Sequence, residues 1–338
     1  MSYDVEVATH DQPDEIEVPD GVTVDGPFAA EPDDLAEPLA AAVLAPRWLT
    51  TVSAGNADAA RKVGRRLAKL HEGAAYDPQE DAVFYPRGQP KRVSAGKPEK
   101  TSIVRLEWYV PAERWAAAPA ELISMLARRC PEALPTRYGD IEPLQQRYDP
   151  EQPDAFAAFI ETNRDVWTFW LASRPSFGGH AHDPEEGAPG HLGLDFDWRV
   201  LDADPRWREA VAGLFAATSS ALGALYAECW VEPGWHVSRN NRLSITGGRK
   251  TRDTPVARGR FPGLPAEPAW LTWFGGEYRE PVAAALDGVG RLRKGLVRRP
   301  VTPAVTPHDG GLCVRLGEQP RAKLPALPLP GELLRPLG

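Results

Sequence analysis

The residues of this 338-residue chain that could do chemistry are concentrated between residues 176 and 199, which hold three of its seven histidines. His180 and His182 are two apart, so in extended chain their imidazoles point to the same side, with Asp183 beside them. Asp195 and Asp197 have the same relation to each other on the segment that follows. Imidazole nitrogens and carboxylate oxygens together can bind a hard or borderline divalent ion. If the two segments form a hairpin, these five residues are candidate ligands of one metal ion in a metal-dependent hydrolase.

The strand predicted over residues 191–200 supports a different interpretation. Its apolar residues alternate with polar ones, which is typical of a strand with one buried face. The opposite face, which carries His191, Asp195, Asp197 and Arg199, is then an exposed polar surface for recognition. The His-x-His-Asp sequence lacks the fixed spacing that makes motifs such as His-Glu-x-x-His specific for metal. Both interpretations stay open at this stage, and recognition is favoured.

The other catalytic signatures are incomplete. Ser176 is not part of a Gly-x-Ser-x-Gly elbow, and the Gly-Gly-Arg-Lys-Thr sequence from residue 247 lacks the spacing of a phosphate-binding loop. Cys130 and Cys229 fall on apolar faces of predicted helices, where an inert buried thiol is expected. We therefore expect no catalytic residues and no cofactor, apart from the divalent ion of the alternative interpretation.

A second compact motif, Arg-Tyr-Gly-Asp-Ile-Glu-Pro over residues 137–143, predicts a shaped turn because glycine and proline flank its charges. The charges either fix that turn through internal ion pairs or face a partner. The candidate binding residues, from this motif and the strand, are Arg137, Tyr138, Asp140, Glu142, His191 and Arg199.

The domain organisation follows from composition and periodicity. Residues 1–40 are acidic and proline-bearing, which predicts a disordered tail. Residues 41–100 contain an amphipathic helix over residues 57–72 and then a linker. Residues 101–318 form the main domain, and residues 319–338 are a Pro/Leu-rich tail.

Strands and helices alternate irregularly in the main domain. Strands are expected over residues 103–110, 166–174, 191–200, 270–275 and 310–316, and helices after Pro119, over 153–164, from Pro205 to about Cys229, and over 278–290. This pattern predicts an α+β fold in which a mainly antiparallel sheet packs against helices as a two-layer sandwich.

Charge and cysteine content limit the possible partners. The whole chain has a net charge of −8, but its first 46 residues carry 12 acidic and no basic side chains. The remaining residues hold 39 basic and 35 acidic side chains, a net charge of +4. Nucleic-acid binding would require a clustered basic face, and no run is apolar enough to span a membrane. Three widely spaced cysteines without a pairing pattern favour a reducing compartment, so a cytoplasmic location is expected.

The order of three motifs resembles a bacterial group. The 137–143 segment, the 191–200 strand before a long helix, and Trp-Leu-Thr-Trp-Phe-Gly over residues 270–275 are similar to immunity proteins of polymorphic-toxin and type VI secretion systems. This resemblance covers residues 101–318. It implies a non-enzymatic protein that binds and neutralises a cognate toxin. The acidic chain would suit a basic toxin domain as the protein partner. The acidic N-terminus and the His180–Asp183 loop have no counterpart in the group.

Overall fold

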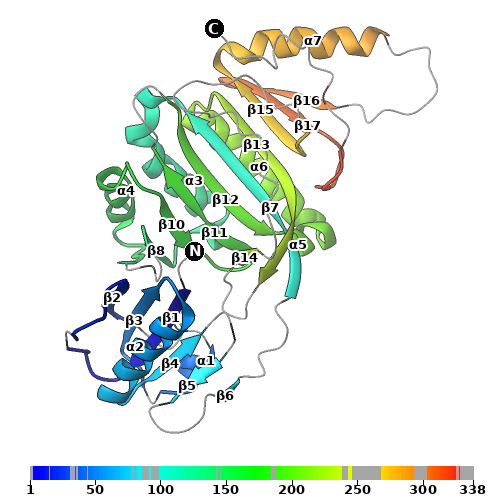
Figure 1. Cartoon of the computed structure of the whole chain (residues 1–338). Coiled ribbons are helices and arrows are strands. Elements are labelled where there is room, and N and C mark those ends of the chain that lie inside the picture. Colours follow the sequence, from blue (N-terminus) through cyan, green and yellow to red (C-terminus); the bar gives the residue numbers. More distant parts are fainter. Residues whose placement is uncertain are drawn as a thin grey trace. The chain divides into compact units, whose positions relative to one another are not determined.

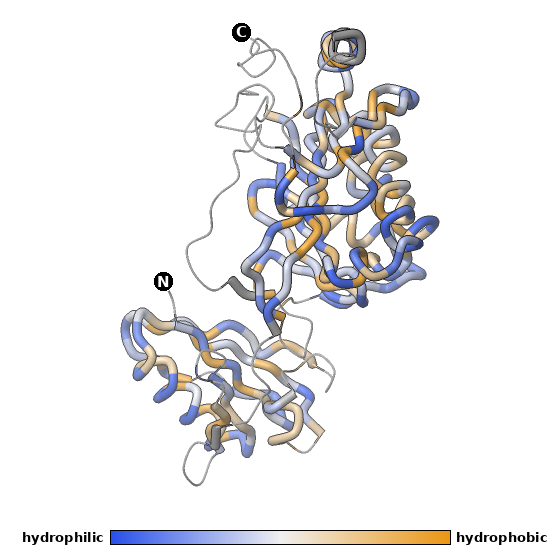
Figure 2. The backbone as a smooth tube through the Cα atoms, turned by 90° about the vertical axis from the view of Figure 1, so that its right-hand side faces the viewer, coloured by the Kyte–Doolittle hydropathy of each residue, from blue (hydrophilic) through white to orange (hydrophobic). Residues whose placement is uncertain are grey.

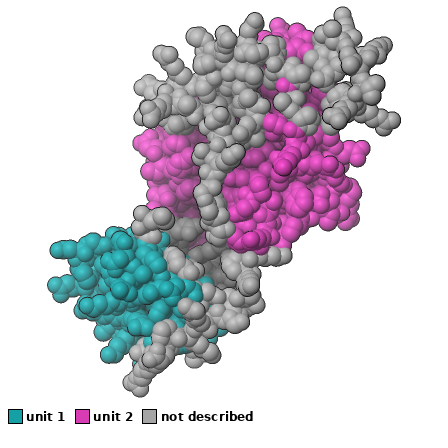
Figure 3. Space-filling view, turned by 45° about the vertical axis from the view of Figure 1, so that its right-hand side comes forward, with its two compact units in different colours: residues 1–99, 237–242 teal, residues 100–236, 243–338 magenta. Residues whose placement is uncertain are grey.

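The chain divides into two compact units (Figures 1 and 3). Unit 1 comprises Met1–Glu99 with Val237–Arg242, and unit 2 comprises Lys100–His236 with Leu243–Gly338. The computed structural model describes residues 3–14, 16–30, 35, 37–43, 45–77, 80, 82–85, 91–92, 99–141, 144, 146–183, 188–237, 243–245, 268–292, 303–324 and 327.

Unit 1 is a six-stranded sheet with the order β2-β3-β1-β4-β5-β6. Helix α2 (Ala57–Leu70) is capped by Asn56, whose side chain accepts a hydrogen bond from Ala59 N at 2.9 Å. Val63 and Leu67 of this helix are buried against the sheet, which confirms the amphipathic helix expected here. The elements of unit 1 are β1 (Tyr3–Thr9), β2 (Val22–Ala29), α1 (Glu37–Ala40), β3 (Trp48–Ala54), α2 (Ala57–Leu70), β4 (Ala74–Asp77), β5 (Ala82–Phe84) and β6 (Lys91–Arg92).

The prediction of a disordered tail over residues 1–40 is wrong for the strands β1 and β2. Strand β1 lies between β3 and β4 and pairs with β3 along its whole length. Val5 and Val7 are fully buried, while Asp4 and Glu6 alternate with them. The acidic average of the segment concealed this short period-two pattern, in which every second residue can face the core.

Unit 2 is an eleven-stranded sheet with the order β16-β17-β15-β13-β7-β12-β11-β10-β8-β9, and β14 pairs with β13. Its strands are β7 (Glu99–Val110), β8 (Arg137–Gly139), β9 (Gln146–Arg147), β10 (Thr168–Leu171), β11 (Ser176–His182), β12 (Gly190–Asp197), β13 (Tyr226–Val237), β14 (Leu243–Ile245), β15 (Leu271–Gly275), β16 (Ala304–His308) and β17 (Gly311–Arg315). Its helices are α3 (Ala118–Arg129), α4 (Pro153–Thr162), α5 (Trp198–Ala203), α6 (Pro205–Leu222) and α7 (Arg279–Leu292), with short 3₁₀ turns at Ala112–Ala117, Pro131–Ala133 and Gly276–Tyr278.

One face of the unit 2 sheet carries the main hydrophobic core, under α3, α4 and α6 (Figure 1). The expected apolar side of the 191–200 segment lies in this core. Hydrophobic and hydrophilic residues alternate repeatedly along the backbone (Figure 2). Together with the antiparallel pairing of β7, β12, β11, β10 and β8, the core under α3, α4 and α6 confirms the α+β fold with helices on an antiparallel sheet.

We call the opposite side of this sheet the second face. At one end of it, Val282 and Leu286 of α7 pack on Tyr109, Tyr226 and Phe274, so a third layer is present there. Elsewhere the second face carries the polar residues of β7, β11 and β12. The hairpin that the metal interpretation required is formed by β11 and β12, with His182 opposite His191.

Several element boundaries differ from the predictions, and two of the differences have a clear local cause. The strand expected to reach residue 200 ends at Asp197. The side chain of Asp197 accepts a hydrogen bond from Arg199 N and so caps the start of α5. The expected helix to Cys229 ends at Leu222, because Gly223 adopts a left-handed conformation with φ of 59°. Cys229 is buried, as expected for an inert thiol, but it lies in strand β13.

No helix within the described ranges has both the length and the apolar character required to cross a lipid bilayer. Residues 319–338 lie largely outside the described residues. Leu324 and Leu327 from this segment pack on the cores of unit 2.

Candidate functional site

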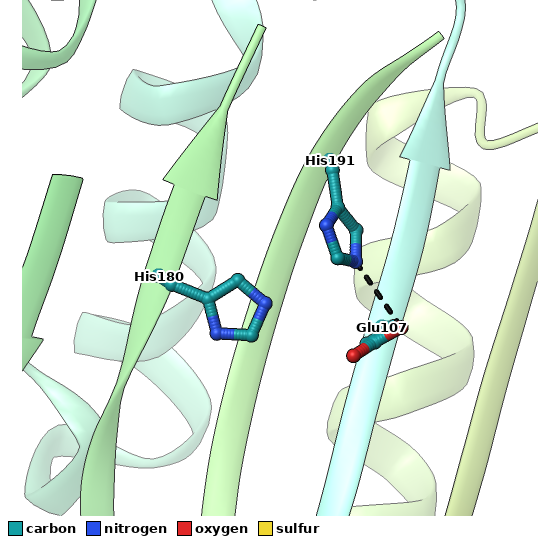
Figure 4. A group of neighbouring side chains, drawn as sticks. All are labelled: Glu107, His180 and His191. Atoms are coloured by element: carbon teal, nitrogen blue, oxygen red, sulfur yellow. Dashed lines mark ion pairs between the residues drawn. The ribbon is translucent and has the colours of Figure 1, made fainter. Parts of the chain in front are cut away.

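The second face of unit 2 holds a compact group formed by Glu107, His180 and His191, one residue from each of three adjacent strands (Figure 4). The register of the sheet explains the group. His180 of β11 lies opposite Gly193 of β12, and Gly193 lies opposite Glu107 of β7. These three positions form one row across the sheet, and His191 is two residues before Gly193 on the same face.

Gly193 makes room for the imidazole of His180. A Cβ atom at position 193 would lie 2.2 Å from Cε1 and 2.3 Å from Nε2 of His180, closer than non-bonded atoms approach. The ring therefore occupies the space that a side chain of β12 would fill. This is how a histidine on β11 comes near a glutamate two strands away.

Aromatic rings surround His191. Tyr109 stacks on its imidazole, with ring centroids 5.0 Å apart and an interplanar angle of 6°. Trp167 meets the ring at its edge with centroids 5.6 Å apart, and His180 lies 5.0 Å away at 62°. In this arrangement Nε2 of His191 lies 3.2 Å from Oε2 of Glu107.

Glu107 is a buried carboxylate that stays ionised. Glu107 is only 4% exposed, and the Tyr109 hydroxyl donates a hydrogen bond to its Oε2 at 3.0 Å. Burial alone would raise the pKa of Glu107, but the nearby His191, His180 and Arg105 outweigh it and lower the pKa to about 2. Burial and the negative charge of Glu107 hold the pKa of Tyr109 well above its usual value, so this hydroxyl remains a donor.

The structure does not bring together the five residues predicted as metal ligands. Asp183 pairs with Arg164, and Asp195 accepts two hydrogen bonds from Arg105, each 2.8 Å long. Asp197 pairs with both Arg174 and Arg199. Each carboxylate of that set is thus neutralised by arginine.

Of the two histidines in that set, only His180 belongs to the group with Glu107 and His191. His182 stacks on Trp167 with ring centroids 4.7 Å apart. Burial and the proximity of His191 lower the pKa of His182, which favours its neutral form.

The expectation of an exposed polar face at Asp195 and Asp197 is wrong, since these residues are only 8% and 2% exposed. Their arginine partners explain how such burial is tolerated, because a buried charge requires a countercharge and hydrogen bonds. For Asp197, burial would raise the pKa, but Arg199 and Arg174 lower it on balance. The alternation identified the correct face but not the ion pairs that cover it.

The 137–143 motif lies at strand β8 and the turn after it. Arg137 donates a hydrogen bond to the Leu144 carbonyl at 2.8 Å, which supports the interpretation of charges that shape the turn. Tyr138 is buried in the core, where its ring meets those of Phe156 and Phe159 edge to face. Asp140 is partly buried next to β8, and Glu142 lies outside the described residues.

Three large apolar residues that the sequence did not single out are exposed at the edge of this region. Val166, Trp167 and Phe169 are 46%, 39% and 42% exposed. The rings of Trp167 and Phe169 stack with centroids 6.2 Å apart, and Phe169 lies opposite His180 in the sheet. We call these three residues the aromatic edge.

Comparisons with known proteins show little. No protein-family model matches the sequence, and no curated protein matches it. A solved structure described as a Pseudomonas aeruginosa T6SS protein is similar over 65% of this chain and 69% of that chain, with 13% sequence identity and a TM-score of 0.38. A similarity this low leaves the function to be argued from the residues of this chain.

Proposed function

We propose that this protein is a non-enzymatic binding protein of the immunity type, which neutralises a cognate bacterial toxin by direct contact through its aromatic edge. The observation that carries the proposal is the exposure of Trp167 and Phe169 side by side on the second face. Tryptophan is enriched among the residues that dominate binding energy at protein interfaces, and adjacent exposed aromatic rings present a large rigid area.

The surroundings of the aromatic edge support this role. His182 stacks on Trp167 on one side, so the indole ring is already held in place before a partner arrives. A side chain that is ordered in advance loses little conformational entropy on binding. The ion pair between Arg164 and Asp183 places charged groups beside His182, which stacks on Trp167. An apolar centre with polar groups nearby is the usual composition of an interface.

The motif order described above supports the choice of a toxin as partner, through its resemblance to immunity proteins. The acidic excess of the chain lies in its first 46 residues, which carry 12 acidic and no basic side chains and would accelerate association with a basic toxin domain. Asp183, Asp195 and Asp197 are paired with arginines, which argues against a metal-dependent hydrolase that uses them as ligands.

The test is co-expression with the product of a neighbouring toxin-like gene, followed by growth measurement and co-purification. We expect growth to be rescued and the two proteins to purify together. The variants Trp167→Ala and Phe169→Ala should each weaken binding by more than about 2 kcal/mol, a typical loss at the centre of an interface.

Leu70→Ala provides a matched control, because Leu70 is also an exposed large apolar residue, 57% exposed, but belongs to unit 1. It should leave binding unchanged. Absence of both rescue and co-purification for the unaltered protein would overturn the proposed function. If Leu70→Ala and Trp167→Ala weakened toxin binding equally, the aromatic edge would not be the binding surface.

A further inference from the structure

We infer that Glu107, His180 and His191 form a binding site for a divalent metal ion of the zinc type. This site goes beyond the proposed function, since toxin binding does not require it. The potential ligand atoms of the three residues all lie within 4.8 Å of one another. Four ligands arranged tetrahedrally around Zn²⁺ at about 2.0–2.1 Å lie roughly 3.3 Å apart, so small side-chain rotations would close the site.

The ligand types suit that ion. Two imidazole nitrogens and one carboxylate oxygen are ligands that Zn²⁺ accepts, and three protein ligands leave its fourth position for water or a partner's group. The donors also lie on three neighbouring strands of one sheet, which is a rigid frame.

The contact between Glu107 and His191 leaves the Nε2 atom of His191 without a hydrogen bond. Nε2 of His191 lies 3.2 Å from the carboxylate, yet it is buried and forms no hydrogen bond to any residue that the structure describes. Its contact with Glu107 is thus an ion pair without hydrogen-bond geometry, which satisfies a buried nitrogen less well than a hydrogen bond does. A metal ion bound by both Nε2 and the carboxylate would satisfy both groups.

The residues around the three donors have the form of a supporting shell. Tyr109 donates a hydrogen bond to Glu107 and stacks on His191, so one side chain orients two ligands. Arg105 is the nearby cation that would oppose a metal ion. Its charge is compensated by Asp195 and by Glu232, whose carboxylate lies 3.0 Å from it.

Gly193 supports the assignment independently. With any larger residue at this position, the ring of His180 could not stay beside Glu107. The chain thus holds a histidine over the backbone of the neighbouring strand, at the location where a third ligand is required.

The experiment titrates the full-length protein, freed of metal by a chelator, with Zn²⁺ and in parallel with Co²⁺. Calorimetry should show one equivalent of Zn²⁺ per chain, and Co²⁺ should give the absorption bands of a low-coordinate nitrogen–oxygen site. His180→Ala and His191→Ala should each weaken Zn²⁺ binding at least tenfold. His308→Ala is the matched control, since it removes a histidine in β16 outside the group, and should leave the affinity unchanged.

Circular dichroism shows whether each variant is folded. If a histidine variant does not fold, Glu107→Gln replaces it, because this substitution keeps the shape of the side chain. Two results would overturn the inference: no Zn²⁺ binding by the unaltered protein, or binding that all of these folded variants retain. Neither result bears on the proposed function, because the toxin is absent from the titration and no metal is added in the growth test.

Discussion

Arg105 and Asp195 face each other across strands β7 and β12 and form a bidentate pair, with both nitrogen–oxygen distances at 2.8 Å. Both residues are buried, and they are 90 positions apart in the sequence. The pair joins the first strand of unit 2 to the strand that carries His191. It therefore holds together the two strands that carry Glu107 and His191.

Removing one partner of this pair should be strongly destabilising. Asp195→Asn leaves the buried guanidinium of Arg105 without its main countercharge, and breaking a buried pair in this way costs about 3–5 kcal/mol. Urea denaturation measures the change. Glu209→Gln is the control, because its pair with Arg315 is at the surface and is worth about 0–1 kcal/mol. Equal losses in the two variants would contradict the importance given to burial.

Stability at acidic pH should depend on Glu107. Its folded-state pKa of about 2 is below the ordinary value of 4.5, so the folded state favours the ionised form. The resulting stabilisation is complete above pH 4.5 and is lost as the pH falls from there towards 2. Between pH 6 and 3, the free energy of unfolding should therefore fall more steeply for the unaltered protein than for Glu107→Gln. Parallel pH profiles from urea titrations would show that Glu107 does not have this role.

Gly193→Ala should destabilise the protein, because its methyl group would overlap the ring of His180. Overpacking of this kind typically costs about 1–3 kcal/mol. Gly213→Ala is the matched control, since a Cβ at this position in helix α6 meets nothing within 4 Å. It should instead stabilise by about 0.4–1 kcal/mol. Thermal denaturation should show a lower melting temperature for Gly193→Ala and a higher one for Gly213→Ala. An unchanged melting temperature for Gly193→Ala would mean that His180 can leave the group freely.

Deletion of residues 1–9 should unfold unit 1. Strand β1 lies between β3 and β4, so its loss leaves two buried edges and removes Val5 and Val7 from the core under α2. Hydrogen exchange should show that the amides of α2 lose protection, while those of α6 in unit 2 keep theirs. Unchanged protection in α2 would restore the interpretation of the N-terminus as a dispensable tail.

Local periodicity predicted much of the main domain. The alternation at Leu192 and Leu194 identified the core face of β12, and proline after Asp204 identified the start of α6. Both signals depend on residues next to one another in the chain. The end of α6 was misplaced because the apolar spacing continues into β13, and only the left-handed Gly223 marks the change.

The candidate site could be predicted only in part. His180 and His191 were identified by their types, but Glu107 lies in a strand whose β-branched and aromatic residues indicated nothing beyond a strand. Its place beside the histidines depends on the register of β7 with β12 and of β12 with β11, which the sequence does not reveal. Arg164, Arg105 and Arg174, which pair with Asp183, Asp195 and Asp197, were missed for the same reason, since each of these three pairings is between separate segments.

The position of β7 in the sheet also affects how the protein folds as it is synthesised. This strand ends at Val110, yet it lies between β12 and β13, and β13 begins only at Tyr226. A growing chain must therefore extend by more than a hundred residues before the centre of the sheet can close. Pairing between such distant segments is slow, and an incomplete chain exposes an apolar strand edge that can aggregate. Slow folding and early dependence on chaperones are the expected consequence.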